Sequence, residues 1–245
     1  MLKYLLITFF TLCFISLSNA QTKSTISPKD TATYRMERDV YFNALKYSDL
    51  NVAKGAIFKM MAINPLDKSL KDSLLFIYFN AGSFGQCILL SRELLAENPS
   101  RNNILEIKAI AEQNLGLVKD ALVSYEKLFS ESKNLFHQYQ IAVLQYQLKR
   151  YGECNQNISD IIKDDKSLSE KVNINTGQEN QKVILKAAAY NIRGVMQLEG
   201  KRDEEAKADF KEALKIQPDF ALALNNIQLV EKKVKPSPAK PSVKK

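Results

Sequence analysis

Small side chains recur in this 245-residue chain with a period of 34 residues. Three of the five positions are 34 residues apart, the fourth follows after 33, and the fifth follows after 52, which is one period plus an insertion of 18 residues. Helices that pack about 8–10 Å apart need small residues where their backbones approach. The period therefore predicts stacked helix pairs. The five positions are Ala53, Cys87, Ala121, Cys154 and Ala206.

Prolines keep the same spacing, because Pro65, Pro99 and Pro218 each lie 12 residues after one of the small residues. Proline ends a helix, since it lacks the N–H group and its ring clashes with the preceding turn. In the third repeat, Lys133 stands where the proline would fall. Gly82 and Gly116 lie in the expected turns between paired helices, where the absence of a side chain relaxes the turn.

The repeats resemble the tetratricopeptide repeat (TPR) family over residues 31–234. The resemblance is clearest at 187–220, where six residues match the fourth, eighth, twentieth, twenty-fourth, twenty-seventh and thirty-second positions of the family: Tyr190, Gly194, Ala206, Phe210, Ala213 and Pro218. It implies an all-α, right-handed superhelical solenoid of about five helix-turn-helix repeats plus a C-terminal capping helix. The residues expected to pack between helices are Ala53, Cys87, Ala121, Cys154, Gly194, Ala206, Phe210 and Ala213.

The first twenty residues have the layout of a cleaved secretory signal peptide. Lys3 precedes an apolar run from Leu5 to Leu17, and Ser18-Asn19-Ala20 supplies small residues for a cut after Ala20. Thirteen apolar residues would reach about 20 Å as a helix, which is short of a hydrocarbon core about 30 Å thick. We expect an exported protein of the cell envelope, which is either periplasmic or secreted.

The other segments differ in composition from the repeats. Residues 21–30 are expected to be a polar linker, residues 167–180 an inserted loop with few apolar side chains, and residues 235–245 a disordered tail rich in proline and lysine. The net charge is +8; removing Lys3 leaves +7, and residues 231–245 carry +5 through six lysines against one glutamate. Most of the net positive charge therefore lies in the C-terminal segment and not on one face of the fold, which argues against a nucleic-acid partner. The tail could instead touch an anionic surface, or simply keep the chain soluble.

No catalytic, cofactor-binding or metal-binding site is predicted. Cys87 and Cys154 lie two repeats apart, at least about 16–20 Å, whereas a disulfide needs Cα atoms within roughly 7 Å. We expect two buried, reduced thiols. His137 is the only histidine and is expected at a helix terminus or on the surface. The acidic run 203–205 falls in the first turn of a helix, where carboxylates complement the helix dipole.

The resemblance also implies a concave groove lined by the first helix of each pair. Mapped onto this chain, the groove positions are apolar and aromatic, which suits a peptide or an amphipathic helix of another protein. The same side chains could instead pack between repeats. The expected partner-groove residues are Phe42, Phe76, Phe79, Ile110, Tyr139, Val143 and Tyr146.

We therefore expect a non-catalytic scaffold or adaptor that binds another protein, with no cofactor. Two alternatives stay open: a subunit or accessory factor of an enzyme that processes an envelope polymer, and a structural spacer. An enzyme would need a polar cleft with shifted acids. A spacer would have a groove filled by its own side chains. The sequence gives neither the partner nor the oligomeric state.

Overall fold

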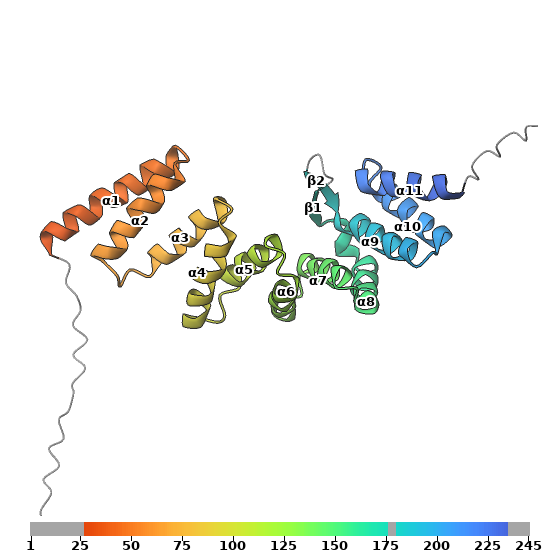
Figure 1. Ribbon diagram of the computed structural model, residues 1–245, viewed down its shortest axis with the longest axis horizontal. Coiled ribbons are helices and arrows are strands. Elements are labelled where there is room, and N and C mark those ends of the chain that lie inside the picture. Colours follow the sequence, from red (N-terminus) through yellow and green to blue (C-terminus); the bar gives the residue numbers. More distant parts are fainter. Residues whose placement is uncertain (1–26, 176–179, 235–245) are drawn as a thin grey trace, which may run out of the picture. The chain divides into compact units, whose positions relative to one another are not determined.

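The computed structural model describes residues 27–175 and 180–234 (Figure 1). The predicted signal peptide 1–20, the first six residues of the predicted linker and the predicted tail 235–245 lie outside the described residues. The chain divides into two compact units, Met1–Asp67 and Lys68–Lys245. Both are built from helix pairs, and the predicted all-α helical-repeat fold is confirmed.

The first unit is the pair α1 (Pro28–Lys46) and α2 (Leu50–Ile63). Helix α1 begins inside the segment that we expected to be linker, because Ser27 caps it. The Ser27 hydroxyl accepts a hydrogen bond from the Asp30 N–H at 3.1 Å, and Pro28 at the helix start has a backbone already suited to the first turn. The Asp49 carboxylate caps α2 in the same way, accepting from the Val52 N–H at 3.1 Å.

The second unit contains four further helix pairs and a final helix. An insertion separates the third of these pairs from the fourth. The helices are α3 (Ser69–Asn80), α4 (Phe84–Glu97), α5 (Asn102–Asn114), α6 (Val118–Ser132), α7 (Leu135–Gln147), α8 (Tyr151–Lys163), α9 (Leu185–Glu199), α10 (Asp203–Ile216) and α11 (Ala221–Val234).

The same backbone turn joins the helices of every pair. Its central residue has a left-handed backbone, with φ between 57° and 70°, and the next N–H donates to the carbonyl five residues back. This bond satisfies a carbonyl that the helix end leaves without a partner. The turns repeat every 34, 34, 33 and 52 residues, which is the period of the small residues. Their central residues are Ser48, Gly82, Gly116, Lys149 and Lys201.

In the connection between α6 and α7, a residue with a left-handed backbone stands in place of the proline. Lys133, at the position that lacks the proline, has φ 52° and ends α6, with its N–H donating to the Phe129 carbonyl at 2.9 Å. A lysine can therefore end this helix by changing backbone conformation, where proline would have ended it by lacking a donor.

Within the described residues, the insertion after α8 forms regular secondary structure where the sequence suggested a loop. It consists of a short 3-10 helix, η1 (Asp165–Leu168), and a hairpin of β1 (Lys171–Asn175) and β2 (Asn180–Ile184). The strands are antiparallel, with Val172 opposite Val183. Both valines are buried in the core of the second unit, which holds the hairpin in place beside α9 (Figure 1). Helix α9 starts at Leu185, directly after β2.

The small residues of the repeat lie where helices meet. All five have 0% exposure, and so do Phe210 and Ala213; Gly194 is also buried. In the last pair the ring of Phe210 on α10 lies against Gly194 on α9. Helix α11 covers this pair, since its Val230 packs with Ala206 and Phe210. A solenoid needs such a final helix because its last repeat would otherwise expose an apolar face.

Candidate functional site

The seven predicted groove residues have very different exposures. Phe42, in the first unit, is 59% exposed, and Phe76 is 54% exposed. Tyr139 is 6% exposed and belongs to the core, because the helices and the hairpin of the second unit cover its ring. The remaining four are half-buried, and their role in binding stays a prediction: Phe79, Ile110, Val143 and Tyr146.

Three of these residues line one cavity of about 600 Å³, bounded by α5, α6, α7 and the hairpin. Such a volume is typical of a ligand-binding pocket. Half of the lining side chains are apolar or aromatic: Ile110, Tyr125, Phe136, Tyr139, Val143 and Ile174. The other half are carboxamides, and we call the site the carboxamide cavity: Gln113, Asn114, Gln140, Asn173, Asn175 and Asn180.

Hydrogen bonds hold one wall of the carboxamide cavity. The Gln113 amide on α5 donates to the Gln140 side-chain oxygen on α7 at 3.0 Å, and the Tyr125 hydroxyl on α6 donates to the Gln113 oxygen at 3.2 Å. Burial raises the pKa of Tyr125 and of Tyr139 above the ordinary tyrosine value. Both phenols therefore stay neutral. The wall joins three helices without an ion pair.

Among residues 27–175 and 180–234, none of the side chains that line the carboxamide cavity is charged. Helix α7, which crosses it, has no Asp, Glu, Lys or Arg between Leu135 and Gln147. A charged ligand group would lose its hydration there and find no counter-charge, which is costly. The cavity thus favours a neutral ligand that has an apolar part and many hydrogen-bonding groups.

Sequence reasoning found the helical side of this site and missed the hairpin side. The signal for the hairpin was the alternation of apolar residues at Val172 and Ile174; the second strand gives none, because its apolar residues Val183 and Ile184 are adjacent. Each stretch is short, and the asparagines between them resemble loop composition. Two strands with so few apolar residues are marginal alone, so their stability comes from contacts with the helices.

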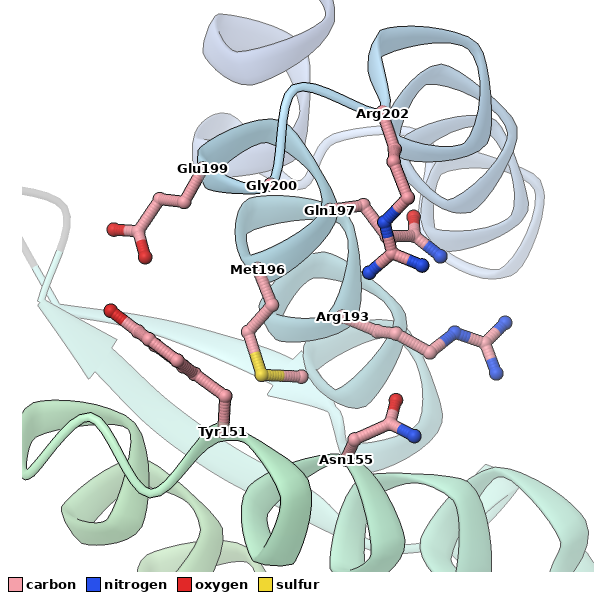
Figure 2. A pocket seen from close by; sticks show the side chains of 8 residues that line it. All are labelled: Tyr151, Asn155, Arg193, Met196, Gln197, Glu199, Gly200 and Arg202. Carbon is pink, nitrogen blue, oxygen red and sulfur yellow. The ribbon is translucent and has the colours of Figure 1, made fainter.

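A second pocket, of about 330 Å³, lies between α8 and α9 (Figure 2). Figure 2 shows Met196 extending from α9 toward α8, between Tyr151 on one side and Asn155 on the other. Its two arginines are already paired, Arg193 with Asp209 at 2.6 Å and Arg202 with Glu205 at 3.1 Å. The charges of both arginines are therefore neutralised by carboxylates of the protein itself, so this pocket is a poor candidate for an anion site.

Both described cysteines are free and buried. Burial raises the pKa of Cys87 to about 11 and that of Cys154 to about 12. Since the thiolate is the reactive form, both are poor nucleophiles and poor metal ligands. They fill the small-residue position of their repeats, as the sequence predicted.

His137 lies at the start of α7, but it is buried, contrary to the alternative of a surface histidine. Its Nδ1 is 3.1 Å from the Ser132 hydroxyl, and its Nε2 is 3.6 Å from a Glu106 carboxylate oxygen. The imidazole links α6, α7 and α5, which is a structural role. The acidic run Asp203-Glu204-Glu205 lies in the first turn of α10, as expected.

A search of residues 27–175 and 180–234 finds no cluster of side chains that could bind a metal ion. Across the same residues, no helix combines the length and the apolar character that a membrane span requires.

The repeated pairs, their common turn and the final covering helix define a helical-repeat protein. No family model matches the chain, and no curated protein matches its sequence. Solved structures do match its fold. YrrB, described as a TPR protein with an unusual peptide-binding site, has a TM-score of 0.60 at 14% identity and covers 83% of this chain and 100% of its own. The chain thus has the tetratricopeptide-repeat fold.

Two further structures resemble it to the same degree. A MamA protein has a TM-score of 0.59 at 14% identity, over 78% of this chain and 95% of its own. MamA from residue 41 to its end, from Desulfovibrio magneticus RS-1, has a TM-score of 0.60 at 10% identity, over 80% of this chain and 99% of its own. These identities show a common fold and nothing finer.

Proposed function

We propose that this chain is a non-catalytic interaction scaffold that holds an extended segment of another protein in the carboxamide cavity. The observation that carries the proposal is the cavity itself, which has neutral hydrogen-bonding groups and apolar side chains on facing elements. A peptide backbone offers alternating donors and acceptors, and carboxamides can pair with both. The peptide-binding site named for YrrB adds support from a protein of similar fold.

Two features favour a scaffold over a spacer. The cavity stays open although aromatic residues surround it, and Phe76 leaves more than half of its side chain exposed. A spacer would gain stability by filling such space with its own side chains. Apolar surface that is retained instead is typical of an interaction site.

The test inserts a charge into the neutral cavity. Nonapeptides are selected from a random display library against the full chain, and the affinity of the best one is measured by fluorescence anisotropy. We expect Val143→Lys to weaken this affinity at least tenfold, because the ammonium group would lie among uncharged groups.

Val123→Lys is the matched control, because Val123 is 66% exposed on α6 and does not line the cavity. It should leave the affinity within twofold. Circular dichroism of both variants checks that the helices are retained. Equal affinities for the two variants would place the binding site elsewhere, and failure to select any peptide would reject the function.

We also propose that the scaffold acts in a cell envelope after export. The support is the arrangement of Lys3, the apolar run and the small residues that end at Ala20. The expected mature chain begins at Gln21, which N-terminal sequencing of the protein from the exported fraction would detect. Recovery of Met1 at the N-terminus of that fraction would contradict the proposed cleavage.

A further inference from the structure

The two edges of the hairpin differ in whether their outward backbone groups have hydrogen-bond partners. Along β2, the side chain of Gln217 takes the place of a third strand. Its amide donates to the Lys182 carbonyl at 3.1 Å, and its oxygen accepts from the Ile184 N–H at 2.8 Å. Gln181 adds a bond from its amide to the Asp219 carbonyl at 2.7 Å. The β2 edge is therefore occupied by the segment that joins α10 to α11.

The pairing register shows which groups β1 presents on its other edge. In an antiparallel pair, residues alternate between bonding to the partner strand and pointing outward. Leu185 continues the ladder, since its N–H donates to the Glu170 carbonyl at 2.9 Å. In the next pair, Lys171 with Ile184, the backbone N–H and C=O groups therefore point outward, as the Ile184 N–H does toward Gln217. The same holds for the pair of Asn173 with Lys182.

Lys171 and Asn173 consequently direct their backbone N–H and C=O groups away from β2. Neither residue has a hydrogen-bond partner for these groups in the part of the chain that the structure describes. An unpaired strand edge is a ready template for another strand, and proteins usually cover or charge such edges. Here the β2 edge is covered, and the β1 edge is left available at Lys171 and Asn173.

The available edge borders the carboxamide cavity. Asn173 and Ile174 of β1 line it on one side, and Gln140 and Val143 of α7 line it on another. On β2 only Asn180 lines the cavity, and the edge at Lys182 and Ile184 is bound to Gln217 after α10. A polypeptide in the cavity would thus have a strand edge on one flank and helix side chains on the other.

We propose that an uncharged, extended segment of a partner protein enters the carboxamide cavity and pairs with β1 as a third strand. The inference rests on the proposed function and specifies its binding mode. Main-chain hydrogen bonds with Lys171 and Asn173 supply affinity, and alternate side chains of the segment face the helices. The residues from Lys171 to Asn173 extend about 10 Å, so the segment pairs over at least this length.

The charges identify this occupant. The described residues that line the cavity include no charged side chain, and α7 contributes none, so we expect the segment inside it to be neutral. The chain's own residues 235–245 do not match, because they contain four lysines and three prolines. Lysine would bring unpaired charge into the cavity, and proline has no N–H group to donate to a strand.

The experiment removes single backbone donors. Asn173→Pro deletes the outward N–H of β1 and no bond of the hairpin, since position 173 lies outside the hydrogen-bonded pairs. Lys182→Pro is the matched control: it is the cross-strand neighbour, and proline keeps the carbonyl that accepts from Gln217. We expect the first variant to bind the display-selected nonapeptide at least tenfold more weakly, and the second to bind within threefold of the original chain.

Two further measurements separate backbone pairing from other effects. Asn173→Ala removes the side chain but keeps the N–H, so it should lose clearly less affinity than Asn173→Pro. The same nonapeptide is also made in two forms, methylated on the even or on the odd backbone nitrogens. An added strand turns only alternate N–H groups toward β1, so one form should lose at least tenfold and the other less than threefold.

The outcomes distinguish the binding mode from the function. Equal losses from Asn173→Pro and Lys182→Pro, or equal losses from the two methylated peptides, overturn the strand pairing. If Val143→Lys weakens binding while Asn173→Pro does not, the peptide binds in the carboxamide cavity but does not pair with β1 as a third strand. If no peptide binds the original chain, both proposals fail.

Discussion

Replacing Arg193 with Met should lower the free energy of unfolding by about 3 kcal/mol. The Arg193 guanidinium on α9 donates two hydrogen bonds to the Asp209 carboxylate on α10, at 2.7 and 2.6 Å. The Asp209 side chain is only 7% exposed, and Arg193 is its one recorded partner among the described residues. Removing one partner of a buried pair leaves an uncompensated charge, which costs about 3–5 kcal/mol. Because Arg193 itself is 26% exposed, we expect the lower end of that range.

Urea unfolding followed by circular dichroism measures this loss. The hydrogen bonds to Asp209 are also the main reason why the pKa of Arg193 is raised, so the arginine stays charged throughout. Arg193→Met combined with Asp209→Leu should recover most of the stability, because a buried ion pair can be replaced by apolar groups at little cost. A double variant as unstable as the single one would show that packing, and not the unpaired charge, causes the loss.

Arg202→Met is the control for Arg193→Met, because Arg202 lines the same pocket between α8 and α9. Its ion pair with Glu205 has both side chains 56% exposed, and exposed pairs contribute at most about 1 kcal/mol. We expect less than about 0.5 kcal/mol from this change. Equal losses from the two arginine variants would contradict the assignment of Arg193 as the partner of the buried Asp209 carboxylate.

The repeat could be predicted from the sequence because its cause is local and periodic. A small residue is needed at each close approach of two helices, so Ala53, Cys87 and Ala121 mark the contacts without any knowledge of the partner helix. The turn follows the same rule, but glycine occupies it only at Gly82 and Gly116. Elsewhere serine or lysine adopts the left-handed backbone, and composition gives no signal for that.

The carboxamide cavity could be predicted only in part, because it depends on contacts between distant segments. Ile110 and Val143 follow from their places in the repeat. Asn173 does not, since its role comes from a hairpin that packs through Val172 and has one edge covered by Gln217, 44 residues further along the chain. Tyr139 occupies a groove position, but the insertion and α9 belong to the core around it, so burial replaces exposure.

The second large effect is expected at the closest approach of two helices, where Gly194 on α9 faces Phe210 on α10. A Cβ atom on residue 194 would lie 2.6 Å from Cε1 of the Phe210 ring, closer than carbon atoms can approach. The ring is fully buried and cannot turn into solvent. Gly194→Val adds two methyl groups beyond that Cβ, so we expect it to cost about 3 kcal/mol through overpacking, measured by urea unfolding.

A smaller partner should relieve this strain. Phe210→Leu alone leaves space unfilled and should cost about 1–2 kcal/mol, yet combined with Gly194→Val it should cost clearly less than the sum of the two. Gly152→Val, on α8, is the control for valine in a helix: no atom lies within 4 Å of its added Cβ, so stability should change by less than about 0.5 kcal/mol. Additive losses in the double variant would mean that the two residues do not meet, and the packing of the last helix pair would then be wrong.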